Sequence, residues 1–265
     1  MTTPFLTIVT RCCKRPAMLS LCIDSVRALM DCSVEQVFIV DKKQIGILRA
    51  NLLFAQHTHR IDGEYVYILD DDTLLTNTRF VTHIREAAAD NPGIIMVRSW
   101  RSQLNPHTLP NNNVWGDKEK LKMATTNSLT YVVRADLWKQ HIGEYGIAAG
   151  GDWAFLEKLR DEGHSFVWVN QMMAETQQLG RGENFEKCKD NWFEQVIRKY
   201  KLDQVKPGDW RLRLQENPDP ITAEVSPLPL PLPLSVQKVT RIPSYHSHTK
   251  HISTKHVILG RRVKQ

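Results

Sequence analysis

The chain has 265 residues, of which 42% are hydrophobic, and a formal net charge of +6, which suits one α/β domain plus a tail. No apolar run approaches the ~18 residues of a membrane span, and the first residues lack the charged and then apolar pattern of a signal peptide. We therefore expect a cytoplasmic protein with no membrane span. The five cysteines form no Cys-x-x-Cys pair, so we expect reduced thiols and no zinc site.

Short apolar runs alternate with amphipathic segments along the first 200 residues, which indicates an α/β fold. The expected strands are rich in β-branched and aromatic residues and cover 6–10, 37–40, 65–69, 94–97, 129–133 and 166–169. The expected helices have apolar residues at helical spacing and cover 17–30, 45–56, 77–89, 150–162 and 185–200. Residues 99–118, rich in Asn and Pro, are expected to form a long loop, and long loops in compact domains are often functional.

Three consecutive carboxylates, Asp70, Asp71 and Asp72, follow the expected strand at 65–69. The carboxyl end of such a strand is where open α/β sheets place their ligands. Adjacent carboxylates repel one another, so a fold that keeps them together gains from a cation, and their oxygens suit Mg²⁺ or Mn²⁺, which also bind phosphate oxygens. The triplet predicts a divalent metal that holds a diphosphate; the alternative interpretation is a solvated acidic turn.

Two common nucleotide-binding signatures are absent from the sequence. No Gly-x-Gly-x-x-Gly follows the first expected strand, and there is no Gly-x-x-x-x-Gly-Lys-Ser/Thr loop. A nicotinamide-dependent enzyme and a P-loop ATPase are therefore disfavoured. On the expected helix at 45–56, Arg49 and Asn51 could reach a diphosphate or a ribose, or could belong to a solvated helix face.

The last 45 residues differ in composition from the rest. After Ser226, proline and leucine alternate over 227–234, which disfavours helix and favours an extended segment. Residues 221–265 also carry the whole basic excess, because the remainder of the chain has equal numbers of acidic and basic side chains. We divide the chain into a domain at 1–220 and a Pro/Leu-rich, basic tail at 221–265. Such a tail could bind DNA or another polyanion, or could be a solubilising terminus.

The order of motifs resembles a known family. It runs from a strand with Thr10-Arg11, through a strand ending at Asp41 and the Asp70–Asp72 triplet, to Gly150-Gly151-Asp152. Over roughly residues 4–175 this is similar to the GT-A fold of nucleotide-sugar glycosyltransferases, particularly family 2 of inverting enzymes. The resemblance implies a Rossmann-like, mostly parallel central sheet flanked by helices.

The resemblance also implies roles for individual residues. The implied donor-binding residues are Thr10, Arg11, Asp41, Asp70 and Asp71, to which the helix residues Arg49 and Asn51 are added. Asp72 is the implied direct metal ligand with Asp70 as its partner, and a histidine of the C-terminal segment, His246 or His248, could be a third ligand. Asp152 is implied to be the catalytic base; the alternative is that it caps the helix, a very common role for Asp.

We therefore expect a metal-dependent, inverting glycosyltransferase of the hexosyltransferase type. It would move one sugar from a nucleotide sugar, with a UDP-sugar as the expected donor and Mn²⁺ or Mg²⁺ as the ion, to a hydroxyl of a saccharide or of a hydroxymethylated DNA base. Two alternatives stay open. A nucleotidyltransferase is expected to have a glycine-rich signature early in the chain, whereas residues 7–16 contain no glycine. A non-enzymatic nucleic-acid binder would rely on the basic tail alone.

Overall fold

The computed structural model describes residues 3–29, 33–41, 47–101, 106–146, 150–177, 191–201 and 212–215, with only the backbone described for 47–49 and 212–215. The chain divides into two units, 1–220 and 221–265, and every described residue lies in the first. The predictions for the tail, including the metal-ligand role of His246 or His248, therefore lie outside the described residues. None of the described helices is long and apolar enough to cross a membrane.

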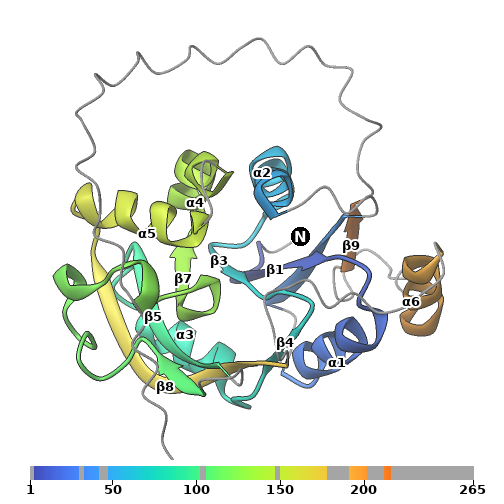
Figure 1. The fold of residues 1–265 in the computed structure, drawn as a ribbon, viewed down its shortest axis with the longest axis horizontal. Coiled ribbons are helices and arrows are strands. Elements are labelled where there is room, and N and C mark those ends of the chain that lie inside the picture. The colour runs from blue at the N-terminus through green and yellow to red at the C-terminus, as the bar shows by residue number, and fades with distance from the viewer. Residues whose placement is uncertain are drawn as a thin grey trace, which may run out of the picture. The chain divides into compact units, whose positions relative to one another are not determined.

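A curled mixed sheet forms the centre of the first unit, with helices on both of its faces (Figure 1). Its strands are β1 Leu6–Cys12, β2 Val34–Val40, β3 Tyr65–Ile68, β4 Thr73–Leu75, β5 Ile94–Arg101, β6 His107–Leu109, β7 Tyr131–Arg134, β8 Phe166–Thr176 and β9 Leu212–Gln215. They lie in the order β4-β8-β5-β7-β3-β1-β2-β9, and β6 pairs with β5.

The sheet is less uniformly parallel than the sequence indicates. β1 pairs in parallel with β2 and β3, β2 with β9, and β5 with β8. Between these groups β7 runs antiparallel to both β3 and β5. The direction of a strand depends on the segments that join it to its neighbours, and these segments show no hydrophobic period. The expectation of α/β layers is confirmed, while the reversed strand was not predicted.

The helices are α1 Pro16–Arg27, α2 Ile47–Gln56, α3 Phe80–Ala87, α4 Ala135–His141, α5 Gly151–Asp161 and α6 Trp192–Tyr200. Short 3₁₀ segments are η1 Thr58–Arg60, η2 Lys118–Lys120, η3 Met123–Thr125, η4 Ser128–Thr130 and η5 Ile142–Gly146. The segments β4, β6, α4 and β9 were not expected. Of the helix expected at 185–200, the part at 185–190 lies outside the described residues.

Successive residues of the central strands point to opposite faces and fill two separate cores, as the two-residue period of a strand requires. On β3, Val66 and Ile68 pack with apolar residues of α2, α4 and α5. Their neighbours Tyr65 and Tyr67 pack on the other face with residues of α1 and α3. Because both faces are covered, the strand is apolar throughout, and polar side chains are confined to its end, where the acidic triplet begins.

Candidate active site

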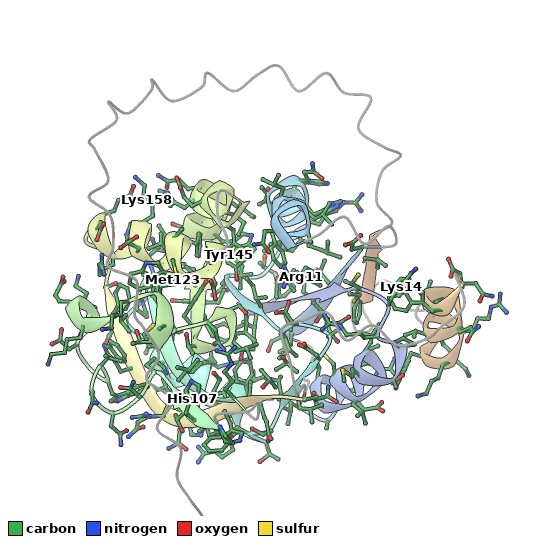
Figure 2. The ribbon with its side chains drawn as sticks, viewed as in Figure 1. Arg11, Lys14, His107, Met123, Tyr145 and Lys158 are labelled. Carbon is green, nitrogen blue, oxygen red and sulfur yellow. The ribbon has the colours of Figure 1, made fainter. Side chains whose placement is uncertain are left out.

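A cavity of about 460 Å³ lies at the carboxyl ends of β1 and β3. Its volume is typical of small-molecule binding pockets, which measure about 300–1,000 Å³. Charged residues of its wall are Arg11, Arg15, Arg101, Asp70, Asp72 and Asp152. Uncharged residues of its wall include Asn51, Met123, Thr126, Asn127, Ser128, Tyr145 and Thr176. Arg11, Met123 and Tyr145, labelled in Figure 2, come from β1, η3 and η5, so segments far apart in the sequence build one site.

Arginines hold the acidic triplet together. The Arg15 guanidinium bridges two of the carboxylates, with Nη2 2.5 Å from Oδ1 of Asp71 and Nη1 2.8 Å from Oδ2 of Asp72. The Arg11 guanidinium lies 3.1 Å from Oδ1 of Asp70. Asp71 is fully buried, and its second oxygen accepts a hydrogen bond of 2.8 Å from the backbone N–H of Cys13. The middle carboxylate thus fastens the end of β3 to the end of β1.

The triplet lies in a partly desolvated environment that its arginines only partly offset. Burial raises the pKa of Asp71 and of Asp72, while the Arg15 guanidinium acts to lower both. Three carboxyl groups face two guanidinium groups, so the cluster has an excess of one negative charge when all three are ionised, a form that a bound cation would favour. A cation can therefore still be attracted to this end of the sheet.

Arg11 is positioned from two sides. Besides its contact with Asp70, its guanidinium donates a 2.5 Å hydrogen bond to Oδ1 of the buried Asn51 on α2 and lies over the Phe54 ring. A side chain with such partners has a fixed direction, because each contact restricts its rotamers. The structure thus brings together three residues that the sequence assigned to the donor, namely Arg11, Asn51 and Asp70.

Asp152 is the second residue of α5 and makes no ion pair within 4 Å among the described residues, although the more distant charge of Arg11 acts to lower its pKa. Gly150, in the left-handed conformation at φ 94°, is the N-cap residue, and Oδ1 of Asp152 accepts a 2.9 Å hydrogen bond from the N–H of Trp153. Burial raises the pKa of the Asp152 carboxyl, the charge of Asp70 raises it further, and the bond from Trp153 partly opposes both. A carboxylate with a raised pKa is a stronger base than an exposed one.

The start of α5 is pressed against η5. A Cβ atom placed on Gly151 would lie 1.8 Å from the carbonyl oxygen of Tyr145, so only glycine fits there. The hydroxyl of Tyr131 donates a 3.0 Å hydrogen bond to the carbonyl oxygen of Asp152. These contacts fix the backbone that carries the carboxylate and explain why the Gly-Gly-Asp sequence is needed at this point.

Three of the predicted donor-binding side chains lie outside the cavity wall as the described residues form it. Thr10 is buried and accepts a 2.8 Å hydrogen bond from Gln36, and buried Asp41 has the Cys13 thiol 3.8 Å from its Oδ2. Asp71 is the third, with the structural contacts given above. A contact of these three with the donor stays a prediction, and the Arg49 side chain lies outside the described residues.

The sequence did not point to Arg15, Arg101 or Tyr145 as site residues. Arg15 had one usable signal, since it lies four residues after Arg11 in the turn before Pro16, where the chain leaves the expected strand. Arg101 is the last residue of β5, and Tyr145 lies in η5. The sequence pattern of neither segment indicates that its residue lies at the edge of the sheet where the cavity forms. Asn127 and Ser128 were likewise missed in the segment between η3 and β7.

The residues present fit a hard divalent ion. Asp70 and Asp72 both border the cavity, and each gives one oxygen to an arginine. Among the described residues, Oδ2 of Asp70 has no hydrogen-bond or ion-pair partner, and Oδ1 of Asp72 accepts a hydrogen bond only from the Thr73 hydroxyl, at 3.3 Å. Two carboxylate oxygens beside a cavity are the usual protein contribution to a Mg²⁺ or Mn²⁺ site, with water and phosphate completing the shell.

Comparisons with known proteins bear on the fold. No protein-family model and no curated protein sequence matches the chain. S. aureus TarS 1–349 in complex with UDP-GlcNAc is similar in structure, with a TM-score of 0.53 at 11% identity over 73% of this chain and 64% of that chain. A further TarS structure gives a TM-score of 0.52 at 9% identity over 75% of this chain and 39% of that chain.

A third comparison, with TarS 1–349 in complex with UDP, gives a TM-score of 0.50 at 10% identity and covers 73% of this chain and 63% of the other. This chain thus spans less than two thirds of each TarS chain. The likeness shows that it has the GT-A fold of nucleotide-sugar glycosyltransferases. The fold class that the sequence predicted is confirmed.

Proposed function

We propose that this protein is a glycosyltransferase that moves one sugar from a nucleotide sugar to a hydroxyl acceptor with inversion at the anomeric carbon. The single observation that carries the proposal is the position of Asp152. Its carboxyl, with a pKa raised by burial, borders the same cavity as Asp70, Asp72 and their arginines. A site for a phosphorylated donor and a group able to accept a proton thus adjoin, as a transfer to a hydroxyl requires.

The donor would bind at the acidic end of the cavity. Arg11, Arg15 and Arg101 provide positive charge for a diphosphate, and Asn51 and Asp70 provide hydrogen-bonding groups for a nucleoside. A UDP-sugar is the expected donor, and the complexes of TarS with UDP-GlcNAc and with UDP support a donor of this class. Asp70 and Asp72 would hold Mn²⁺ or Mg²⁺, and such an ion, when bound, neutralises charge on the leaving diphosphate.

The reaction would proceed by direct displacement. Oδ2 of Asp152 takes the proton of the acceptor hydroxyl while the hydroxyl oxygen forms a bond to the anomeric carbon. The bond from that carbon to the phosphate oxygen breaks on the opposite face, and its electron pair leaves with the nucleoside diphosphate. The N–H of Trp153 keeps Oδ1 of Asp152 in place, so the other oxygen is directed to the acceptor.

The acceptor would lie against the segment from η3 to η4. Thr126, Asn127 and Ser128 line this part of the cavity beside the exposed Met123, a mixture of neutral polar and apolar groups that suits a saccharide. The charge of residues 221–265 favours DNA with hydroxymethylated bases as a second candidate acceptor. A chain truncated after Pro220 separates the two, since transfer to hydroxymethylated DNA should fall if the tail binds that acceptor, whereas transfer to a saccharide should not change.

The test is a panel of UDP-, GDP- and dTDP-sugars with Mn²⁺. For each donor, the rise in melting temperature is measured, and so is the release of the nucleoside diphosphate in the presence of acceptors. We expect one donor class to stabilise the fold and to yield a nucleoside diphosphate. Formation of a nucleoside triphosphate and a sugar 1-phosphate when pyrophosphate is added to the sugar nucleotide would instead identify a nucleotidyltransferase running in reverse. Absence of any nucleotide effect would contradict the proposal and favour a binding protein.

A further inference from the structure

Two histidines and a glutamate meet at the end of α5 opposite to Asp152. His141 is the last residue of α4, Glu162 follows the last residue of α5, and His164 comes two residues later. One ligand atom from each of the three lies within 4.8 Å of the others. Glu162 comes ten residues after Asp152 along the helix, at a rise of about 1.5 Å per residue, which places this cluster about 15 Å from the start of α5. Lys158, labelled in Figure 2 away from Arg11 and Tyr145, marks the same end of the helix.

The way α5 ends explains why these side chains converge. Gly163 adopts the left-handed conformation at φ 81°, its N–H donates to the carbonyl of Arg160 at 2.9 Å, and the N–H of His164 donates to the carbonyl of Leu159 at 3.2 Å. This is the usual glycine-terminated end of a helix. It turns the chain back so that Glu162 and His164 lie side by side, facing the last residue of α4.

The contacts within the cluster differ from ordinary hydrogen bonds. Nε2 of His141 lies 3.0 Å, and Nε2 of His164 3.4 Å, from the same Oε2 of Glu162. Both nitrogens are shielded from solvent, yet neither makes a hydrogen bond of good geometry. The other oxygen of Glu162 is occupied by Lys158, whose Nζ is 3.0 Å away, so the two imidazoles share one oxygen.

These distances suit a tetrahedral metal ion. With metal–ligand bonds of about 2.0–2.1 Å, tetrahedral geometry places ligand atoms about 3.3–3.4 Å apart. The side chain of His141 is only 8% exposed, whereas a third of the Glu162 side chain is exposed. An ion could therefore enter from the side of the glutamate. Two imidazoles and one carboxylate form the ligand set of many zinc sites, which keep a fourth position for water.

We propose that His141, Glu162 and His164 bind a transition-metal dication of the zinc class, separate from the hard-ion site at Asp70 and Asp72. The ion would link the ends of α4 and α5 and so stabilise the helix that carries Asp152 at its other end. The site is independent of the proposed sugar transfer. The expectation of no zinc site considered only the cysteines, whereas this site uses one imidazole from the end of α4 and one from the turn that follows α5.

The experiment uses the full chain freed of metal by chelation. Zn²⁺ alone is titrated by calorimetry into the wild type, His164→Ala and Glu162→Gln, and Co²⁺ serves as a spectroscopic probe of tetrahedral coordination. His164 is the main target because it is partly exposed, so its replacement is less disruptive than replacement of buried His141. The matched control is His83→Ala, since His83 also lies beside a glutamate, Glu86, at 3.5 Å but has no second imidazole in that contact.

The tail histidines are present in every variant, so differences between variants isolate the cluster. We expect the wild type and His83→Ala to bind one Zn²⁺ that raises the melting temperature, and His164→Ala and Glu162→Gln to bind it at least about tenfold more weakly. Equal Zn²⁺ stoichiometry and affinity in the wild type and in folded His164→Ala would overturn the proposal. The cluster would then be an ion-paired histidine pair that holds the two helices without metal.

Discussion

The two carboxylate-bearing walls of the cavity are built in opposite ways. After β3, three adjacent carboxylates are held by Arg11, Arg15 and a backbone N–H. At the start of α5 a single carboxylate, Asp152, has a backbone N–H as its hydrogen-bond donor and no ion pair among the described residues. Both walls are partly desolvated, but only the first contains its own positive charge.

The difference separates two chemical tasks. Guanidinium groups fix the paired carboxylates in position and partly offset the rise in pKa that burial causes, which suits the binding of a cation and a diphosphate. A carboxylate that is desolvated without a cationic partner gains affinity for a proton, which suits a general base. The same residue type would therefore serve binding on one wall and proton transfer on the other, and the five predictions that follow test this division.

The largest effect on stability is expected for Arg15→Ala. This change leaves Asp71 fully buried without its ion-pair partner, and breaking a buried pair costs about 3–5 kcal/mol of unfolding free energy. Urea unfolding measures the loss. The control is Arg79→Ala, whose pair with Glu86 is exposed and should be worth less than about 1 kcal/mol. Equal stabilities for the two variants would show that Arg15 does not hold the triplet together.

Asp72→Asn should weaken donor binding in the presence of Mn²⁺ by about tenfold to a hundredfold or more, because an amide does not replace an anionic ligand. Titration of the donor with and without Mn²⁺ measures the change, and the effect should be small without the ion. Asp136→Asn, at an exposed carboxylate paired with Arg134, serves as the control. Wild-type turnover that persists in excess EDTA would refute a role for the metal.

The sequence revealed the triplet and the start of α5 because each is a local pattern. An apolar strand that ends in Asp70 and a Gly-Gly-Asp that opens a helix can be recognised from a few neighbouring residues, and family resemblance then suggested their roles. Arg15 could not be found in the same way, since its partners lie more than fifty residues further along the chain. The antiparallel direction of β7 and the meeting of His141 with Glu162 are likewise tertiary outcomes with no local signal.

The raised pKa of Asp152 predicts the acid side of the pH–rate profile. The base must be ionised, so activity is lost as pH falls through its pKa, and burial moves this loss above the ordinary aspartate value of 3.8. The profile of kcat/KM for the wild type measures it. An acid limb at or below pH 3.8 would show that Asp152 is not the desolvated base that the site geometry indicates.

A smaller effect distinguishes a base from a helix cap. The pKa of Asp152 is raised in the folded state, so its ionised form disfavours folding once pH rises above the unfolded-state value. Asp152→Asn should therefore melt at a higher temperature than the wild type at pH 7, and this gain should vanish as pH falls toward 4. Asp161→Asn, at the exposed end of α5, should not show such a gain. Destabilisation by Asp152→Asn at pH 7 would favour a capping role.

The most direct test of the account is transfer by Asp152→Asn with donor affinity measured in parallel. Loss of the base should reduce turnover by about 10²–10⁴-fold, while the donor, held at the other wall, should bind with unchanged affinity. The wild-type product, analysed by NMR, should have an inverted anomeric configuration. Near-normal turnover of Asp152→Asn, or retention of configuration in the product, would contradict the assignment of Asp152 as the catalytic base.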